Sequence, residues 1–94
     1  MAVLQPGRLV TSTAGRDRNA LFLVYRLDSD GFVWVVDGDK RPVDRPKKKN
    51  PKHLKVHDVL DADLAERWAR GEAVTDEEVR AALRRLEEGL EEAD

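Results

Sequence analysis

The chain has 94 residues, of which 40% are hydrophobic and 38% are charged, and it contains no cysteine. This length suits one ordinary domain, or one small domain with a tail. The lack of cysteine excludes a disulfide framework and thiolate chemistry. No apolar run approaches the roughly 20 residues that a membrane helix needs, and the opening MAVLQPGRLV lacks the pattern of a secretory signal. We therefore expect a cytoplasmic protein that does not contact membranes.

The two halves of the chain carry opposite charge, although the net charge is only −2. Residues 1–57 contain twelve Lys and Arg against six Asp, a balance of +6, and residues 58–94 contain five Arg against thirteen acids, a balance of −8. A basic module attracts phosphate, whereas an acidic segment repels phosphate or screens the module. We therefore expect two units, a basic domain at 1–57 and an acidic appendage at 58–94.

Two apolar runs near the start of the chain predict strands at 8–12 and 20–27. The second, ALFLVYRL, is the strongest strand pattern in the sequence, because it is rich in aromatic and β-branched residues and is bounded by turn residues. The segment 13–19 between the two runs is a polar loop. Within it Gly15 adopts a positive φ freely, and Asn19 is one of the few other residues that tolerate this conformation.

The next run, FVWVV at 32–36, contains nothing polar and predicts a strand at the centre of the sheet with both faces covered. Asp37 and Gly38 follow it, and this dipeptide is favoured in tight hairpin turns. Residues 39–43 would then form a short fourth strand. It belongs at an edge of the sheet, because Pro42 cannot donate a backbone hydrogen bond.

Residues 44–52 contain two prolines and three consecutive lysines, so we expect an extended cationic loop and no regular element. A closing strand is predicted from 53 to 57, where Leu54 and Val56 alternate with polar residues. The five short strands, linked mostly by hairpins, indicate a mainly β fold with added α structure, built on a small, partly open, SH3-like five-stranded barrel.

From Asp58 onward the apolar period changes from two residues to about 3.6, which is typical of helices. The apolar positions of the first helix are Leu60, Leu64 and Trp68. Asp58 or Asp61 would cap its start, and Gly71 would end it. These features predict the first half of a C-terminal helical hairpin.

A second helix is predicted from Asp76 to about Glu91. Thr75 and Glu78 have the spacing of a capping box, in which each side chain bonds the backbone of the other residue. The apolar stripe of this helix consists of Val79, Leu83, Leu86 and Leu90. Two such helices cannot hide their stripes unless they fold on each other or dock on the barrel.

Three segments, GRLVTSTAGRDRNALFLVYRL, VDGD and KKKNPKHL, resemble the KOW family of RNA-binding modules. The similarity is closest to the archaeal and eukaryotic large-subunit ribosomal protein of the L-fourteen-e type and to its small bacterial relatives. The matching positions are Gly7, Arg8, Gly15, Arg16, Asp17, Val36, Asp37, Gly38, Asn50, Lys52, His53 and Leu54. The resemblance covers about half the chain and implies an SH3-like barrel that binds structured RNA, usually ribosomal RNA. One departure is Asn19, where the family usually has a second glycine.

A basic cluster around the lysine segment is the best functional lead. It consists of Arg41, Arg45, Lys47, Lys48, Lys49, Lys52 and Lys55. Lysines on an extended loop neutralise phosphates and release counterions, which gives affinity that falls steeply with salt and carries little sequence information. The alternative is a loop that only keeps the protein in solution. The prolines favour the binding interpretation, because a restricted loop loses less entropy when it binds.

Arg16 and Arg18 lie on the first loop beside Gly15, where the backbone can approach a phosphate or a base edge. An arginine at such a place makes two-pronged contacts and stacks on exposed bases. Asp17 between them would orient the two arginines. The alternative is that both are ordinary surface residues paired with Asp17, since exposed pairs of this kind are common.

The aromatic and histidine residues are weaker candidates. Tyr25, Phe32 and Trp34 could stack on single-stranded RNA, but in a barrel this small we expect Phe32 and Trp34 in the core. His53 and His57 share one face of the predicted strand about 13 Å apart, which is too far for one metal ion. We expect His53 to donate to phosphate or to its own backbone.

The sequence contains no paired nucleophile and base, no phosphate-binding loop and no dinucleotide fingerprint. We therefore expect a protein that is not an enzyme and that uses no metal, cofactor or small-molecule substrate. The expected partner is RNA, with ribosomal RNA or a ribosomal particle as target and ribosomal proteins as neighbours. The candidate RNA-binding residues are Arg8, Arg16, Arg18, Arg41, Arg45, Lys47, Lys48, Lys49, Lys52 and His53.

The alternative function is a protein-interaction adaptor of the transcription or translation machinery, which would use the barrel or the helical hairpin. The sequence leaves open which RNA is bound and whether the protein is a permanent ribosomal component or a transient factor. It also leaves open the role of the hairpin and the oligomeric state.

Overall fold

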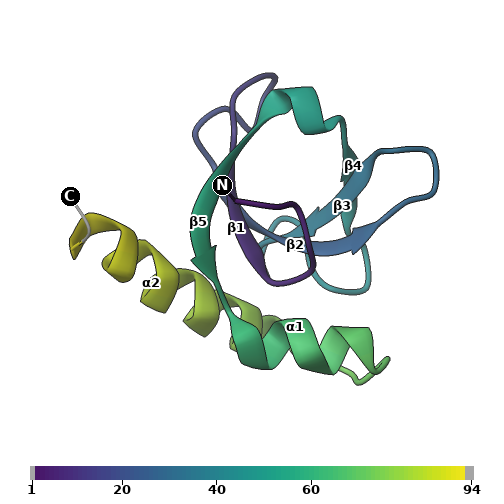
Figure 1. Cartoon of the computed structure of the whole chain (residues 1–94), viewed down its shortest axis with the longest axis vertical. Coiled ribbons are helices and arrows are strands. Elements are labelled where there is room, and N and C mark those ends of the chain that lie inside the picture. Colours follow the sequence, from purple (N-terminus) through teal and green to yellow (C-terminus); the bar gives the residue numbers. More distant parts are fainter. Residues whose placement is uncertain (1, 93–94) are drawn as a thin grey trace.

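The alternating segments form a five-stranded antiparallel sheet, and the two amphipathic segments form helices that follow it (Figure 1). The computed structural model describes residues 2–92. The strands are β1 (Arg8–Ser12), β2 (Leu21–Leu27), β3 (Val33–Val36), β4 (Lys47–Lys49) and β5 (Leu54–Leu60), and the helices are α1 (Ala62–Ala69) and α2 (Asp76–Glu92). One turn of 3-10 helix, Pro51–His53, connects β4 to β5. The strand order is β4-β3-β2-β1-β5, so β4 and β5 are the edges of the sheet.

Most of the predicted strands are confirmed. The strands predicted at 8–12, 20–27 and 32–36 are present with differences of at most one residue at their ends, and the closing strand runs further than expected, to Leu60. The strand predicted at 39–43 is wrong, because this segment has no strand structure. Within residues 2–92 no helix is both long enough and apolar enough to cross a membrane.

A turn centred on Asp37 explains why 39–43 does not form a strand. The backbone N–H of Asp37 donates to the carbonyl of Arg41 at 2.9 Å. The N–H groups of Asp39 and Arg41 both donate to the Asp37 carboxylate, at 2.9 and 2.8 Å. These bonds use the backbone groups that a strand ladder would need, and Pro42 has no N–H to offer.

The lysine segment 44–52 contains β4, which corrects the expectation of a loop without regular structure. Its three lysines pair with β3 through Lys47↔Val35, Lys48↔Trp34 and Lys49↔Val33. Pro46 and Pro51 confine the strand to the residues between them, since proline cannot continue a ladder. An edge strand made of lysine also resists pairing with other chains.

Each face of the sheet carries its own apolar cluster. The inner cluster contains Val10, Phe22, Val24, Val33, Val35 and Leu54. The outer cluster contains Leu9, Leu23 and Val36 from the sheet together with Leu64, Val74, Val79 and Ala82 from the helical part. The inner cluster joins Leu54 on edge strand β5 with Val33 and Val35 near the opposite edge, which requires the sheet to curl (Figure 1).

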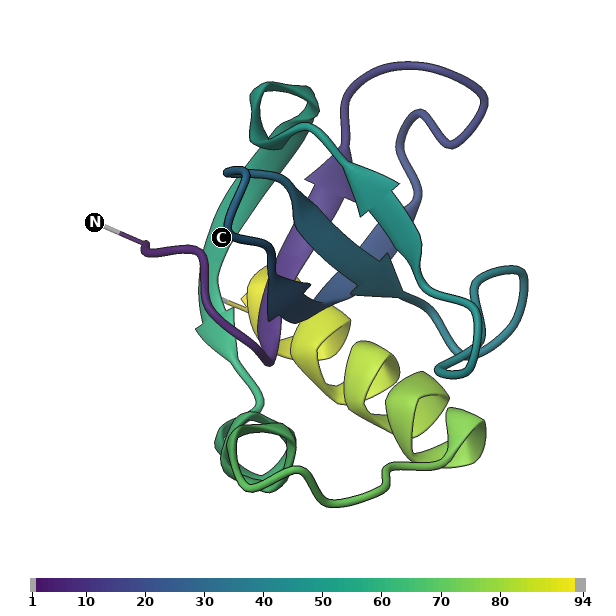
Figure 2. The ribbon, with the colours of Figure 1, turned by 90° about the vertical axis from the view of Figure 1, so that its right-hand side faces the viewer.

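The helices cover part of the outer face of this sheet, and Figure 2 shows α2 running across it. The outer cluster therefore belongs to the sheet and the helices together. The boundary expected between residues 57 and 58 falls inside β5. Residues 58–92 thus contribute four of the seven buried residues of the outer cluster and belong to the core of the domain.

Two glycines allow the helical part to approach the sheet closely. Gly7 has a φ of +89°, its carbonyl accepts the Asp61 N–H at 3.0 Å, and an added Cβ would lie 2.7 Å from the Asp61 carbonyl oxygen. Gly38 has a φ of +77°, and an added Cβ would lie 2.5 Å from the Asp76 carbonyl oxygen and 3.0 Å from Arg80 Cγ. The Arg80 side chain also donates to the Gly38 carbonyl at 2.5 Å. Any side chain at either position would push a helix away.

The helix caps agree with the sequence pattern. Asp61 is the N-cap of α1, and its carboxylate accepts the Leu64 N–H at 3.0 Å and pairs with Arg85 of α2 at 2.7 Å. The capping box is confirmed, since Thr75 Oγ1 accepts the Glu78 N–H at 3.1 Å and the Thr75 N–H donates to Glu78 at 2.8 Å. Asp61 thus both begins α1 and ties it to α2.

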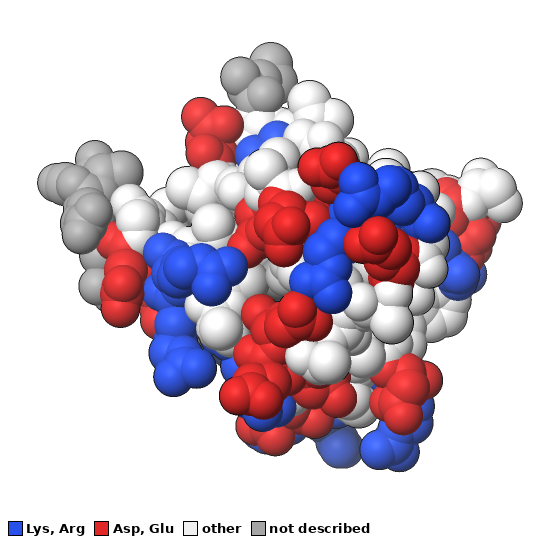
Figure 3. Space-filling view, turned by 90° about the horizontal axis from the view of Figure 1, so that it is seen from below, with Lys and Arg blue, Asp and Glu red and all other residues white. Residues whose placement is uncertain are grey.

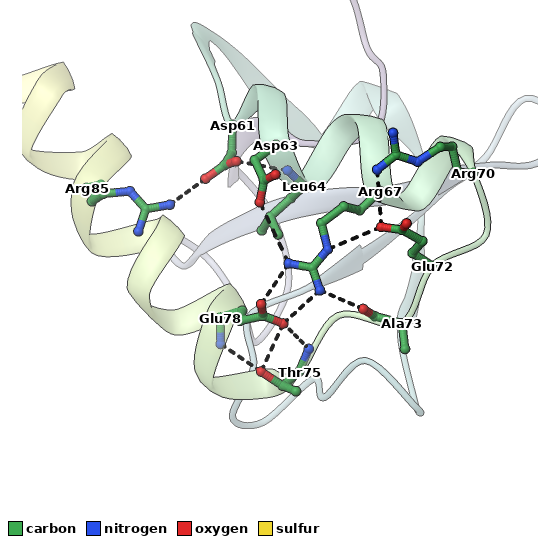
Figure 4. A network of polar contacts seen from close by, with 10 residues as sticks. All are labelled: Asp61, Asp63, Leu64, Arg67, Arg70, Glu72, Ala73, Thr75, Glu78 and Arg85. Atoms are coloured by element: carbon green, nitrogen blue, oxygen red, sulfur yellow. Dashed lines mark hydrogen bonds and ion pairs between the residues drawn. The ribbon is translucent and has the colours of Figure 1, made fainter.

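Arg67 is the centre of a polar network that joins the two helices (Figure 4). Its guanidinium donates to Glu78 at 2.7 and 3.3 Å and to the Ala73 carbonyl at 2.8 Å. It also pairs with Asp63 at 3.7 Å and with Glu72 at 3.6 Å. The acidic segment therefore neutralises part of its own charge. Figure 3 shows the result, a helical face on which acidic and basic side chains alternate.

Acid should weaken the link between the helices through Glu78. The hydrogen bonds from Arg67 and from the Thr75 backbone lower the pKa of Glu78 from 4.5 to about 2. Because this carboxyl binds a proton more readily when the chain is unfolded, its contribution to stability is complete above pH 4.5 and is lost as the pH falls towards 2. In Glu78→Gln we expect proton uptake on unfolding in this window to fall by about one.

Urea denaturation at several pH values measures this proton uptake. Glu77→Gln is the matched control, because Glu77 is the adjacent exposed carboxyl and forms no ion pair within residues 2–90. If the free energy of unfolding falls equally with acid in Glu78→Gln and in the wild type, the Arg67 pair contributes nothing to the folded state.

Candidate nucleic-acid interface

Asp17, in the loop between β1 and β2, gathers three of the candidate cations around one carboxylate. Its Oδ2 lies 3.4 Å from Arg41, 3.7 Å from Lys47 and 3.7 Å from Lys49. Lys47 and Lys49 reach it together because alternate residues of β4 point to the same face of the sheet. Partial burial raises the pKa of Asp17, but Arg41, Lys49 and Lys47 outweigh this effect, so the pKa is lowered overall. The cluster therefore carries a surplus of positive charge.

Asp17 was expected to orient its neighbours in the sequence, Arg16 and Arg18. It pairs instead with residues of the β3–β4 loop and of β4. Arg18 donates to the Thr13 carbonyl at 3.3 Å, and Arg16 and Arg18 are both exposed. Within the described residues neither arginine pairs with Asp17, and both are exposed although Arg18 Nε is bonded to the Thr13 carbonyl.

Two of the candidate residues are buried. The side chain of Lys49 donates to Ser12 Oγ at 2.9 Å, and Lys49 as a whole is only 8% exposed. Arg8 is equally buried, and its Nε donates to the Val3 carbonyl at 2.9 Å. Both side chains hold parts of the fold together, and in this conformation neither is open to a large polyanion.

The exposed candidates gather at one end of the sheet. The Thr13 N–H donates to the His53 carbonyl at 2.9 Å, so the β1–β2 loop lies against the 3-10 turn. Figures 1 and 2 show these two segments side by side at the end of the sheet that is furthest from the helices. The exposed basic residues on them are Arg16, Arg18, Lys52 and His53. Arg45 is exposed on the β3–β4 loop, and no hydrogen bond or ion pair of the described residues joins it to this group.

The β1–β2 loop at this end of the sheet contains one residue in the left-handed backbone region that is not glycine, Asn19. It has a φ of +73°, and it is the only residue other than glycine with a positive φ among residues 2–92. The expectation that asparagine tolerates the left-handed region here is confirmed. Gly15, at the other side of the loop, has a φ of +77°.

Lys48 faces the opposite side of β4 from Lys47 and Lys49. Its ammonium group lies 2.6 Å from Asp30 and 3.4 Å from Asp28. The hydrogen bond that Lys48 donates to Asp30 raises the pKa of Lys48. The three lysines, which looked like one cationic run, are thus divided between two faces and several carboxylates.

Phe32 and Trp34 do not lie in the core, which corrects the prediction. Phe32 is 38% exposed, and neither ring belongs to an apolar cluster of the described residues. The Lys48 ammonium lies 5.4 Å from the centre of the Phe32 ring and 5.7 Å from the centre of the Trp34 ring. On the other side of β3, the guanidinium of Arg26 on β2 lies 5.5 Å from the centre of the Trp34 ring. Trp34 Nε1 donates to Asp28 at 3.1 Å. Both rings therefore lie against charged side chains.

The all-apolar run at 32–36 was misleading because the helices cover only part of the outer face. Val33 and Val35 face the inner cluster, and Val36 reaches the outer one. Trp34, on the outer face near edge strand β4, lies beyond the part that the helices cover. An acidic turn before the run, with Asp28 and Asp30, was the signal in the sequence for polar partners at these rings.

Tyr25 and His57 both contact other side chains of the fold. Tyr25 packs against the outer cluster, with its ring centre 5.3 Å from that of Trp68. His57 Nε2 lies 2.6 Å from Thr11 Oγ1, and burial together with the charge of Lys55 lowers its pKa. Residues 2–92 contain no group of three or more potential protein ligands that could hold a metal ion.

Comparison with known proteins gives no family: no protein-family model matches the chain, and no curated protein matches it. The interpretation of the site therefore depends on its geometry and charge.

Proposed function

We propose that the chain is an RNA-binding module of the KOW type that docks on structured RNA, with ribosomal RNA or a ribosomal particle as target. The observation that carries this proposal is the hydrogen bond of 2.9 Å between the Thr13 N–H and the His53 carbonyl. It brings two basic segments that are far apart in the sequence to one exposed end of the sheet. Together they offer Arg16, Arg18, Lys52 and His53 to a phosphate backbone.

The surplus charge around Asp17 supports the same interface. Arg41 and Lys47 are partly exposed there, with side chains 34% and 37% accessible, and they sit beside the loop that carries Arg16 and Arg18. Such a local field attracts a polyanion over several ångströms before contact. Recognition would then depend mainly on the shape and phosphate spacing of the RNA.

The proposed fold type is an SH3-like barrel. The curl of the sheet supports it, because the inner cluster connects strands from both sides of β2. The bond from Lys49 on edge strand β4 to Ser12 on β1 supports it as well, since it crosses the same inner face at 2.9 Å. In this proposal the protein acts in the cytoplasm as a component of translation and has no catalytic step.

Neutralising the two loop arginines tests the proposal. In Arg16→Gln/Arg18→Gln we expect affinity for a structured ribosomal RNA fragment to fall roughly ten-fold per arginine, because a charge-assisted hydrogen bond contributes about 1.5 kcal/mol. We also expect the slope of log K against log salt to decrease by about one per lost phosphate contact. Filter binding or fluorescence anisotropy across a salt series measures both quantities.

Arg70→Gln/Arg84→Gln is the matched control, since it removes the same charge from two exposed residues, the C-cap of α1 and a residue of α2. Reversing Lys47, Lys48 and Lys49 together would be a poorer test, because Lys49 is buried and Lys48 is held by two aspartates. Equal loss in the arginine pair and in the control would show only a general charge effect. No RNA binding by the wild type at low salt would reject the RNA proposal and favour the protein adaptor.

A further inference from the structure

A hollow of about 210 Å³ opens where the helical part meets the sheet. Its lining comes from four parts of the chain: Tyr25 of β2, Val43 and Asp44 of the β3–β4 loop, Trp68 of α1, and Glu72 and Val74 of the connection to α2. Ligand sites for drug-sized molecules and cofactors usually measure about 300–1,000 Å³. This hollow therefore has room for a single long side chain.

Two aromatic rings form adjacent walls of the hollow. The ring centres of Tyr25 and Trp68 lie 5.3 Å apart, and the ring planes meet at 87°. Neither the Tyr25 hydroxyl nor the Trp68 indole N–H makes a hydrogen bond to another described residue. Neither group is among the buried side-chain atoms that lack a hydrogen-bond partner. The electron-rich faces of such rings attract cations.

The lining of the hollow also includes a carboxylate that forms no ion pair with another described residue, that of Asp44. Glu72 also lines the hollow, but its charge is shared by Arg67 at 3.6 Å and Arg70 at 3.3 Å. Asp44 is exposed and forms no ion pair and no side-chain hydrogen bond with any of residues 2–90. The hollow thus combines aromatic walls with a free negative charge, which complements a cation that is partly apolar.

We propose that this hollow receives an arginine side chain presented by a partner protein. The flat guanidinium stacks on an aromatic face and offers a fork of donors to a carboxylate, so Trp68 and Asp44 would bind it together. Tyr25 and Val43 would contact the aliphatic part of the side chain. The hollow lies where the helical part meets the sheet. The β1–β2 loop and the 3-10 turn lie at the far end of the sheet (Figure 1), so this contact would leave their basic residues open to RNA.

The two tryptophans allow a direct test with an internal reference. We would titrate the ¹⁵N-labelled chain with the capped tripeptide acetyl-Gly-Arg-Gly-amide and follow both indole N–H signals. We expect a saturable shift for Trp68, which lines the hollow, and no shift for Trp34, whose N–H is bonded to Asp28. The same tripeptide with neutral citrulline should leave both signals in place. A tripeptide with lysine should bind more weakly than the arginine peptide.

Asp44→Asn is the informative variant, and Asp39→Asn, an exposed carboxyl on the same loop, is its matched control. We expect Asp44→Asn to weaken arginine-peptide binding about five-fold and Asp39→Asn to leave it unchanged. RNA binding should be the same in both variants. The proposal is overturned if Trp68 does not respond, if citrulline or lysine binds as well as arginine, or if both variants behave alike.

Discussion

Replacing Gly38 by alanine should lower the free energy of unfolding by about 3 kcal/mol, with two separate contributions. The first is backbone strain of about 1 kcal/mol, because alanine disfavours a positive φ. The second is a steric clash of about 2 kcal/mol, because the new Cβ would lie 2.5 Å from the Asp76 carbonyl oxygen. A domain of this size has roughly 5–15 kcal/mol in total, so the loss would be large.

Gly15→Ala is the control that separates the two contributions. Gly15 has the same φ of +77°, but an added Cβ there would meet nothing within 4 Å. We therefore expect only the strain of about 1 kcal/mol at this position. Urea denaturation followed by circular dichroism measures both variants. Equal destabilisation would show that α2 shifts away from Gly38 without loss.

A second pair repeats the comparison on the other helix. Gly7 and Gly31 both have a φ of +89°, and an added Cβ at Gly7 would lie 2.7 Å from the Asp61 carbonyl oxygen, whereas at Gly31 it would meet nothing within 4 Å. Gly7→Ala should thus destabilise the fold more than Gly31→Ala, again by about 2 kcal/mol.

Asp17→Asn should be the most damaging change at the basic end of the molecule. It preserves the size of the side chain but leaves Arg41, Lys47 and the buried Lys49 without their shared counter-charge. We expect the free energy of unfolding to fall by about 2 kcal/mol, which is less than for a fully buried pair because Asp17 is partly open to water. Asp30→Asn is the control, since Asp30 pairs with the exposed Lys48, and it should have little effect.

A double-mutant cycle assigns this loss to the charge pair. Lys49→Met removes the buried ammonium group while keeping an apolar stem, so the combination with Asp17→Asn should be less destabilising than the sum of the two single changes. Additive effects would indicate that Asp17 and Lys49 contribute independently, and would assign the role of Asp17 to Arg41 or Lys47.

Local patterns allowed much of this fold to be predicted. The strand at 20–27 and the helix that begins after Thr75 have strong signals, one in alternation and aromatic content and the other in the Thr75–Glu78 spacing. The left-handed Asn19 followed from the small set of residues that tolerate a positive φ. Each of these features depends on residues close together in the sequence.

The misinterpreted features depend on distant partners. Lysines at 47–49 looked too charged for a strand, but Asp17 and Asp30 come from other loops to pair with them. Arg8 is a separate case: its partner is close in the sequence, since its Nε donates to the Val3 carbonyl, but no sequence pattern indicates this bond. A run of charged residues in the sequence shows only the composition of that segment. The fold decides which of these charges stay unpaired.

The shared outer cluster also sets an order for folding during synthesis. Leu9, Leu23 and Val36 leave the ribosome before the helical residues that cover them, Val79 and Ala82 among these. Until α2 emerges, the growing sheet carries an uncovered apolar face, and the acidic, self-paired helices that follow are the last piece to close it. A nascent chain stalled after β5 should therefore be a target for chaperones, because its outer apolar face is still uncovered.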